Sequence, residues 1–264
     1  MTRLKLRLCF CVGIAMELTS FNEFFNHIYV ITLERETERQ ENIISCLEGL
    51  DYSFFYGIDK KSLVLDDLIA DRTYDEVKTK KLHRYSKPMN TGQIGSSWSH
   101  RLVYEDMIKN GYKNALVLED DVAPLKEGLG LFEEAMKELP QDWELIYFDC
   151  ENNLHRNFGT WVRQLGYHIR SLLGKIKWSH TVINNIYARK YSTNLLVAGM
   201  HDCSTAYAIN LSAAKKLVKL QTPICFTSEG LLSHASTNKI LNAFVYKPRS
   251  FQKDRKLISK TLID

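Results

Sequence analysis

Residues 114–122 read Asn-Ala-Leu-Val-Leu-Glu-Asp-Asp-Val, an apolar run that ends in three consecutive carboxylates. The apolar part is typical of a buried strand, and negative charge at its exit is costly unless a positive group lies beside it. Glu119 and Asp121 are two residues apart, so on an extended backbone both side chains point to the same side. Such a pair suits Mg²⁺ or Mn²⁺ bound to a diphosphate. On this stretch alone, an acidic turn that caps the strand and starts a helix is an open alternative.

Strand and helix patterns alternate on both sides of this run. Residues 27–33 are β-rich and apolar, residues 34–50 combine a polar start with an apolar helical face, and residues 52–56 are again strand-like. This β-α-β order is the unit of a parallel sheet. Later helices are predicted for about 98–110, 129–139 and 212–218, later strands for 143–148 and 204–209, and a loop-rich connection with one helix for 59–90. We therefore expect an α/β fold with a mixed, mostly parallel sheet flanked by helices.

Composition suggests one main domain with basic flanks. We expect residues 1–20 to be an N-terminal extension, residues 21–246 one catalytic domain with a basic insertion at about 151–198, and residues 247–264 a basic tail. The first 15 residues imitate a secretory signal but are too short to span a bilayer, and an upstream extension with Met16 as the true start is favoured. The basic insertion fits an acceptor loop, a membrane-surface patch or an ordinary solvated loop.

Overall composition excludes some classes of protein. The chain has 264 residues, 45% hydrophobic and 25% charged, which is ordinary for a globular protein. Its net charge of +4 gives no argument for a nucleic-acid partner, and none is expected. Six scattered cysteines form no C-x-x-C pair and no cluster at zinc spacing, so we predict free thiols in a reducing compartment.

Two further groups of residues suggest a ligand site. Gly92 and Gly95 precede a predicted helix that carries His100, and glycines there allow close approach of backbone to an anion. The exit of the first strand, from Thr32 to Arg39, would border the same crevice. A turn with a helix cap, a structural histidine and solvated arginines are the open alternatives.

Three blocks together resemble glycosyltransferase family 25, which includes lipopolysaccharide and lipooligosaccharide galactosyltransferases and is related to the collagen galactosyltransferases. They are Ile28–Leu33 with Arg39, Gly92–Gly95 through His100, and Ala115–Val122. The resemblance implies a GT-A-like, Rossmann-type fold and inverting transfer from a nucleotide sugar such as UDP-galactose. Glu119 and Asp121 would bind Mn²⁺ or Mg²⁺. The residues that would border the donor are Thr32, Leu33, Arg39, Gly92, Gly95, His100 and Asp120.

Inverting transfer also needs a group that takes the proton of the acceptor hydroxyl. Asp202 and Glu229 are the candidates, with Asp149 and His201 behind them. Family members often carry an aspartate soon after the proline that corresponds to Pro223, and this chain departs from that pattern.

We expect a UDP-sugar donor, a glycan or glycolipid acceptor in surface-polysaccharide assembly, and a cytoplasmic location with peripheral contact to the inner membrane. The alternatives are a non-catalytic carbohydrate- or lipid A-binding protein of the same fold, and a metal-dependent phosphohydrolase that uses the same carboxylates.

Overall fold

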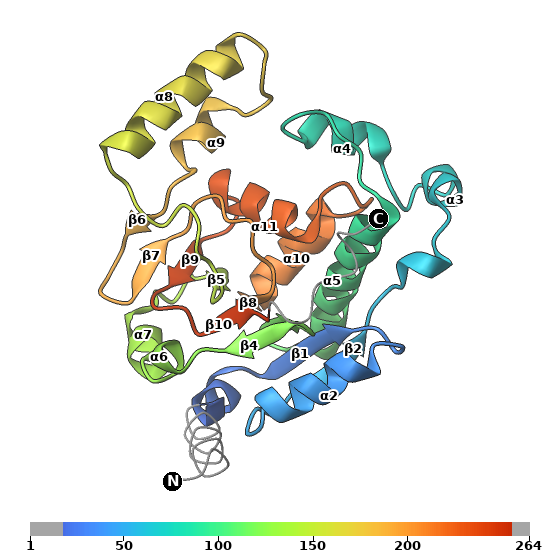
Figure 1. Ribbon diagram of the computed structural model, residues 1–264, viewed down its shortest axis with the longest axis vertical. Coiled ribbons are helices and arrows are strands. Elements are labelled where there is room, and N and C mark those ends of the chain that lie inside the picture. The colour runs from blue at the N-terminus through green and yellow to red at the C-terminus, as the bar shows by residue number, and fades with distance from the viewer. Residues whose placement is uncertain (1–17, 255–264) are drawn as a thin grey trace.

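An eight-stranded sheet lies at the centre of the computed structural model, which describes residues 18–254 (Figure 1). Its strand order is β2-β1-β3-β8-β5-β9-β7-β6. All strands run in one direction except β8 and β7, so the predicted mixed, mostly parallel sheet is confirmed. The strands are β1 (His27–Thr32), β2 (Ser53–Tyr56), β3 (Asn114–Glu119), β5 (Leu145–Tyr147), β6 (Arg189–Lys190), β7 (Leu195–Val197), β8 (Ala206–Asn210) and β9 (Ala243–Tyr246).

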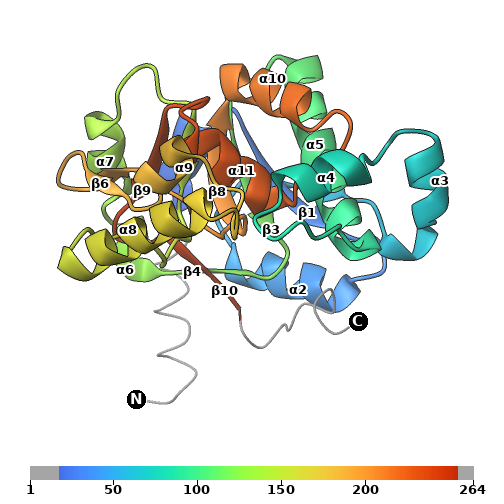
Figure 2. The same cartoon turned by 90° about the horizontal axis from the view of Figure 1, so that it is seen from above.

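Helices cover both faces of this sheet, as Figure 2 shows for α2 and α10 on opposite sides. They are α2 (Thr37–Cys46), α3 (Leu65–Ala70), α4 (Glu76–Leu82), α5 (Thr91–Asn110), α6 (Lys126–Leu129), α7 (Phe132–Glu138), α8 (Phe158–Leu172), α9 (His180–Asn184), α10 (Leu211–Leu220) and α11 (Ser228–Thr237). A 3₁₀ turn, η1 (Lys60–Ser62), precedes α3. Within residues 18–254, no helix is both long and apolar enough to cross a membrane.

Alternation along the strands divides the core into two parts. In β3, Leu116 and Leu118 pack with α2 and α7 on one face, whereas Ala115 and Val117 pack with α5, α10 and α11 on the other. Successive strand residues point to opposite faces, so a strand covered on both sides must be apolar throughout. This is why the run before Glu119 contains no polar residue.

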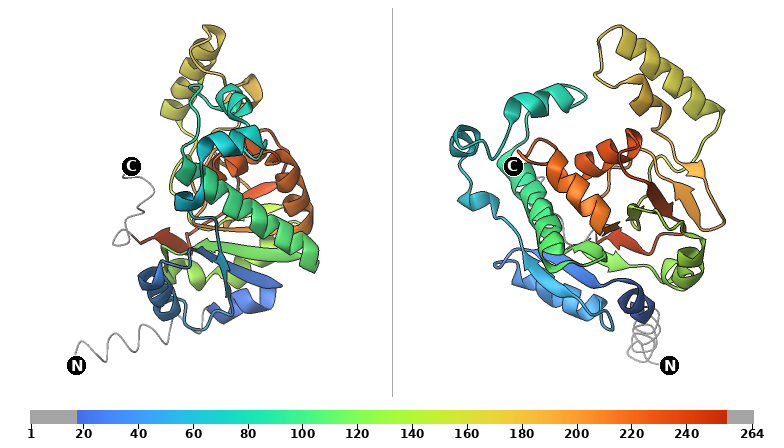
Figure 3. Two further views of the ribbon diagram at one scale, coloured as in Figure 1. Left: turned by 90° about the vertical axis from the view of Figure 1, so that its right-hand side faces the viewer. Right: turned by 180° about the vertical axis from the view of Figure 1, so that it is seen from behind.

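Helix α5 shows how local sequence fixes an element next to the site (Figure 3). The Asn90 side chain accepts from the Gln93 N–H, and the Gln93 side chain accepts from the Asn90 N–H, which forms a capping box. The helix ends at Gly111, whose φ of 69° is the left-handed conformation that glycine adopts without strain. Gly92 and Gly95 therefore lie inside the first turns of α5, not before the helix as predicted.

The ends of the domain differ from the sequence prediction. Leu18 and Phe21, on a helical segment at 18–24, are fully buried, and the Phe21 ring stacks on Phe132 with centroids 3.8 Å apart. At the other end, β10 (Phe251–Lys253) pairs with β4 (Val122–Pro124). Leu18, within the predicted extension of residues 1–20, and Phe251, within the predicted tail of residues 247–264, thus both lie in the core of the domain. The signal-like segment before residue 18 and the tail after residue 254 lie outside the described residues.

The polar connections contain more regular structure than predicted. The 59–90 connection contains η1, α3 and α4 instead of one helix, and the basic insertion contains α8, α9, β7 and the edge strand β6. The helices α3, α4 and α9 have only five to seven residues, and short helices of mixed composition carry little periodic signal, so their sequence pattern resembles that of loops.

The prediction that all cysteines are free is wrong for one pair. Cys150, just after β5, forms a disulfide with Cys203, just before β8. Cys46 and Cys225 are free. The two cysteines are 53 residues apart and belong to no local motif, so their pairing could not be predicted from spacing. They become neighbours only when β5 pairs with β8.

Candidate functional site

The ends of β1 and β3 bring most of the predicted site residues to one edge of the sheet. The two strands are parallel neighbours, with Ile31 opposite Glu119, so the segments that leave them meet at the carboxyl edge. Ligands of α/β sheets bind at such edges.

Two cavities open at this edge and adjoin at Ser96 and Glu119, which line both. The first, of about 150 Å³, is lined by all the predicted donor-binding residues except Gly95: Thr32, Leu33, Arg39, Gly92, His100 and Asp120. The second, of about 580 Å³, is lined by Asp149, Asp202 and Glu229, among others. Glu119 therefore stands between the residues predicted to bind the donor and those predicted to accept a proton.

Glu119 is held by several groups. Its Oε1 accepts a 2.7 Å hydrogen bond from Ser204 Oγ and lies 3.5 Å from His100 Nε2. Burial by itself raises the pKa of Glu119, but the hydrogen bond and charge of His100, the charge of Lys253 and the bond from Ser204 outweigh it, so the pKa lies below the ordinary value. Glu119 is consequently a fixed anion at neutral pH.

Asp120 turns away from its two neighbours and pairs with a basic side chain. Arg39 Nη1 donates to Asp120 Oδ1, and Thr32 Oγ1 donates to Oδ2 over 2.7 Å. The residue thus ties the exit of β1 to the exit of β3 and shapes the wall of the first cavity. The ion pair is what the burial of Asp120 requires.

Asp121 has a different environment. Its Oδ2 lies 2.9 Å from Lys253 Nζ, while its buried Oδ1 has no hydrogen-bond partner. Burial and the charge of Glu119 raise the pKa of Asp121, although Lys253 opposes this. Two carboxylates therefore face one ammonium group, and the cluster retains surplus negative charge.

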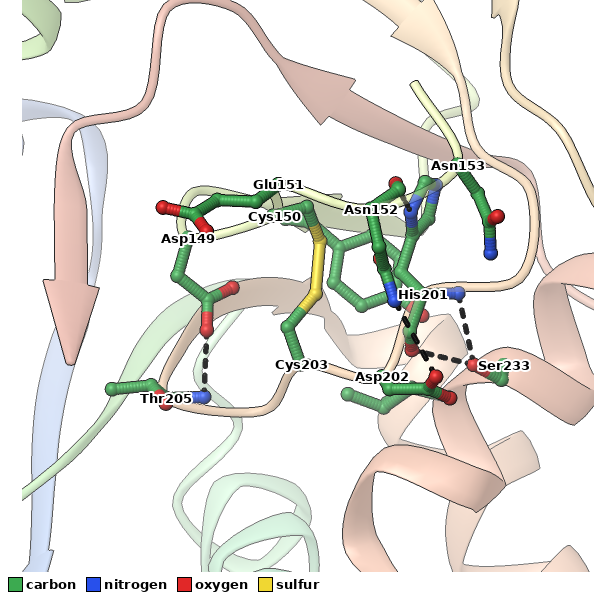
Figure 4. Close-up of a disulfide and its surroundings, with 12 residues drawn as sticks. Asp149, Cys150, Glu151, Asn152, Asn153, His201, Asp202, Cys203, Thr205 and Ser233 are labelled. Atoms are coloured by element: carbon green, nitrogen blue, oxygen red, sulfur yellow. Dashed lines mark hydrogen bonds between the residues drawn. A yellow bond between two sulfur atoms is a disulfide. The ribbon is translucent and has the colours of Figure 1, made fainter. Parts of the chain in front are cut away.

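These features fit a hard divalent cation. Glu119 and Asp121 would hold it, because carboxylate oxygens are preferred ligands and the unpartnered Asp121 oxygen lacks a donor or a cation. Within residues 18–254, the only cluster of three potential ligand atoms within 4.8 Å of one another comprises Asp149, Cys150 and Cys203. Both its sulfurs are bonded in the disulfide, so that cluster is not a metal site (Figure 4).

Gly92, Gly95 and His100 have different places in the structure. Gly92 lines the first cavity. Gly95 does not; a Cβ there would lie 2.9 Å from the Ile58 carbonyl oxygen, so this glycine allows α5 to pack against the 58–60 backbone. His100 is buried, and its Nδ1 lies 2.7 Å from Tyr207 Oη while Nε2 faces Glu119. The imidazole therefore links Glu119 to the core.

The candidate bases differ in exposure. Asp202 is exposed, with one 3.4 Å contact from Asn152 Nδ2 (Figure 4). Glu229 is half-buried and accepts a 3.0 Å bond from Ser228 Oγ, which in turn lies 3.3 Å from Ser204 Oγ. Both carboxylates line the second cavity.

His201 does not fit the role of base. It is fully buried, its Nε2 accepts the Gly199 N–H, and burial lowers its pKa to about 4 despite a 3.0 Å contact of Nδ1 with the Asn152 carbonyl. Its bonds hold the loop that carries Asp202. It is a structural residue of that loop.

Asp149 is the most perturbed carboxyl group of the second cavity. Burial and the charge of Glu119 raise its pKa to about 7, although the backbone N–H of Thr205 donates to Oδ2 over 3.0 Å. Its buried Oδ1 has no hydrogen-bond partner (Figure 4). A carboxyl group that titrates near neutral pH in a cleft is suited to proton transfer.

Sequence reasoning missed three side chains that hold this site. Lys253, Ser204 and Ser228 each come from segments that reach the acidic cluster only through the tertiary fold. No short motif surrounds them. The only sequence signal for any of them was the basic composition of residues 247–264, which include Lys253.

Comparison with known proteins gives a family for this arrangement. The family model described as "Glycosyltransferase family 25 (LPS biosynthesis protein)" matches residues 25–232. The chain belongs to glycosyltransferase family 25. Both Glu119 and the start of α11 with Glu229 lie inside the matched range.

Relatives of this family 25 chain are longer proteins. A "Glycosyltransferase 25 family member" of Aedes aegypti is 29% identical over 207 residues, covering 74% of this chain and 28% of the relative. Human "Procollagen galactosyltransferase 2" is 28% identical over 204 residues, covering 74% and 27%. A bovine relative, 24% identical over 127 residues and covering 47% and 21%, is named "Probable inactive glycosyltransferase 25 family member 3". The chain thus spans less than a third of each of these relatives.

Among solved structures, the apo form of mouse xyloside xylosyltransferase 1 is similar with a TM-score of 0.34 and 11% identity, covering 81% of this chain and 62% of that one.

Proposed function

We propose that this family 25 domain transfers a hexose, galactose from UDP-galactose, to a sugar hydroxyl of a lipooligosaccharide, lipopolysaccharide or other surface glycan, with inversion. The observation that carries the proposal is the position of Glu119 at the junction of two cavities. One cavity is bordered by cationic and metal-ligating groups, as a diphosphate requires, and the other by carboxylates, as an acceptor hydroxyl requires.

On the donor side, the chain has groups to stabilise a departing diphosphate. Arg35, Arg39 and Lys60 line the first cavity, and Lys253 reaches Asp121 from the second. A metal held by Glu119 and Asp121 would supply a Lewis acid beside the leaving oxygen. Asp120 neutralises Arg39 and fixes its position. The Arg39 guanidinium therefore forms part of the cavity wall but adds little net positive charge toward a diphosphate.

On the acceptor side, Asp202 and Glu229 remain the proposed bases. Asp202 is accessible to an incoming hydroxyl, whereas Glu229 connects through Ser228 and Ser204 to Glu119. In-line transfer requires the hydroxyl and the base on the side of the sugar opposite the diphosphate. The arrangement of the two cavities about Glu119 supports this order.

The expected cellular setting is the cytoplasmic face of the inner membrane. The Cys150–Cys203 disulfide is the feature that argues for an oxidising compartment instead, since disulfides are rare in the cytosol. The oxidation state of this pair in cells therefore tests the location.

The experiment is release of UDP from UDP-galactose in the presence of Mn²⁺ and a lipooligosaccharide-derived acceptor. Glu119→Gln with Asp121→Asn should abolish turnover and donor binding. The matched control, Glu133→Gln with Glu134→Gln, changes two exposed carboxylates of α7 and should leave both intact. Full UDP release by the Glu119/Asp121 variant would refute the proposal.

One observation favours a second candidate, a non-catalytic carbohydrate-binding protein. Lys253 already pairs with Asp121, so an ammonium group lies where the metal would bind. Binding of a sugar ligand with no UDP release under any metal condition supports this candidate. Phosphate-ester hydrolysis without nucleotide would instead indicate a phosphohydrolase.

A further inference from the structure

Helix α8 presents an apolar face that no described part of the chain covers. None of its 15 residues is buried. Its apolar side chains recur at intervals of three or four residues, which places them on one side of the helix. They form the apolar face of α8: Phe158 (79% exposed), Trp161 (58%), Val162 (47%), Leu165 (48%), Ile169 (50%) and Leu172 (76%).

The side of α8 attached to the domain is largely polar, with Tyr167 packed against Trp178, their ring centroids 5.3 Å apart. Gln164 Nε2 donates to the Ile183 carbonyl over 2.8 Å, Ser171 Oγ donates to the Trp178 carbonyl over 2.7 Å, and His168 Nε2 lies 3.1 Å from Asn184 Oδ1. A surface helix of a globular protein normally buries its apolar stripe and exposes its polar one. In α8 the apolar stripe is instead exposed, so this face can contact another apolar surface.

The surroundings of α8 are positively charged. Residues 152–201 contain seven lysines and arginines and no acidic residue. Arg163 and Arg170 on α8 and Lys175 just after it are exposed. Lys177 Nζ donates to the Lys80 carbonyl of α4, which joins this basic region to the lysines at the end of α4.

The position of α8 suits a flat partner. The helix lies with α9 at the outer end of the molecule, away from the central sheet, in both Figure 1 and Figure 3. A protruding ridge matches a plane better than it matches a pocket. Five residues, 153–157, connect α8 to Glu151 and Asn152, which line the second cavity.

We propose that the apolar face of α8 docks on a bilayer that contains anionic phospholipid, with its aromatic and leucine side chains in the interface and the nearby cationic groups at the headgroups. Amphipathic helices with a basic polar face bind membranes in this way. A second copy of the chain is a poor occupant, because it would bring two segments of charge +7 together. Docking through α8 does not depend on the proposed transfer reaction; if that reaction holds, docking brings the second cavity close to a lipid-linked acceptor.

The test is cosedimentation of the full chain with vesicles. Binding is expected with phosphatidylcholine vesicles that contain phosphatidylglycerol, and it should weaken with pure phosphatidylcholine and at high salt. Leu165→Glu with Ile169→Glu should weaken vesicle binding roughly a hundredfold, because two apolar side chains that would enter the bilayer interface are replaced by charged ones. Arg163→Gln with Arg170→Gln should weaken it roughly tenfold and flatten the salt dependence.

A matched control distinguishes the α8 face from general stickiness. Ile44→Glu with Val64→Glu replaces two exposed apolar side chains elsewhere (59% and 58% exposed) and should leave vesicle binding unchanged. All variants should unfold at the wild-type temperature, because none of the changed residues is buried. Absence of wild-type binding, or equal binding by the Leu165/Ile169 variant, overturns the proposal. So does a wild-type dimer in solution that this variant dissociates.

Discussion

Lys253 Nζ lies 2.9 Å from Asp121 Oδ2, so a residue of the last described strand neutralises part of the acidic cluster at the end of β3. The contact depends on the antiparallel pairing of β10 with β4, in which Lys253 lies opposite Val122. Burial by itself lowers the pKa of Lys253, but the charges of Glu119 and Asp121 outweigh burial. The net pKa therefore lies above the ordinary value, and the ammonium stays charged at neutral pH. A metal ion and this ammonium group would thus compete for the same carboxylates.

The competition predicts a gain of metal affinity. Lys253→Met should raise the affinity for Mn²⁺ without nucleotide about tenfold, because removal of one neighbouring positive charge lowers the cost of placing the cation. Isothermal titration calorimetry measures this. Lys215→Met, on the exposed surface of α10, is the control and should bind Mn²⁺ like the wild type. Weaker Mn²⁺ binding by Lys253→Met would contradict the competition.

Gly95 of α5 and Gly166 of α8 offer a paired test of the close packing between α5 and the 58–60 backbone. Gly95→Ala places a Cβ 2.9 Å from the Ile58 carbonyl oxygen and should destabilise the protein by about 1–3 kcal/mol. Gly166→Ala meets nothing within 4 Å and should stabilise α8 by about 0.5–1 kcal/mol. Urea unfolding of both variants checks the expectation. An unchanged free energy of unfolding for Gly95→Ala would show that the 58–60 backbone can move away from the added methyl group without cost.

Parallel pairing explains why part of the site could be predicted. Once the apolar runs at 27–33 and 114–119 are recognised as neighbouring strands, their exits must meet, and Thr32, Glu119 and Asp121 follow. Asp149 lies at the exit of β5, separated from β3 by the reversed strand β8, and its proximity to Glu119 depends on that strand order. Local sequence patterns do not encode strand order. The proximity of Asp149 to Glu119, and the hydrogen bond from Ser204 to Glu119, therefore could not be predicted from sequence.

The basic insertion shows a different limit. Its composition indicates only a positively charged segment, and α8 lies within it. The apolar spacing from Phe158 to Leu172 does indicate a helix, but an amphipathic pattern normally points to the core. That this face is exposed follows only from the contacts of Gln164 and Ser171 on the opposite side.

The raised pKa of Asp149 predicts a pH-dependent stability. Its pKa in the folded protein is about 7, against an ordinary value of 3.8, so the folded state favours the protonated carboxyl group. This contribution is fully present below about pH 4 and is lost as pH rises through 7. Asp149→Asn cannot ionise and retains an oxygen for the Thr205 N–H.

The variant should therefore match the wild type only near pH 4, and it should exceed the wild-type free energy of unfolding increasingly as pH rises, by up to about 4 kcal/mol at pH 8. Urea unfolding across this pH range measures the difference, with Glu151→Gln as the control at an exposed carboxylate. A constant difference between Asp149→Asn and wild type at all pH values would rule out titration of this group.

The Cys150–Cys203 disulfide predicts a specific alkylation pattern. In protein denatured without reductant, Cys46 and Cys225 should react with iodoacetamide while Cys150 and Cys203 should not. Replacing both paired cysteines by serine should cost about 2–4 kcal/mol of stability. Mass spectrometry of peptides from cells quenched with iodoacetamide measures whether Cys150 and Cys203 are bonded to each other in the cell. Full alkylation there would indicate a reducing compartment and an open pair.

The choice between Asp202 and Glu229 can be decided by kinetics. Loss of a general base lowers kcat by about 10²–10⁴-fold and leaves donor binding unchanged. Asp202 is exposed and weakly bonded, so Asp202→Asn should show this pattern without loss of stability. Glu229 is bonded to Ser228, which contacts the Ser204 that holds Glu119, so Glu229→Gln should also weaken binding of UDP-galactose with Mn²⁺.

Glu151→Gln is the control, because Glu151 lines the same cavity but pairs with Arg249. It should retain kcat and donor affinity. The pH profile of kcat adds an independent readout, since the variant that lacks the base should lose the acidic limb that the wild type shows. Wild-type kcat in both the Asp202 and Glu229 variants would exclude both residues and leave Asp149, whose pKa burial raises to about 7, as the next candidate base.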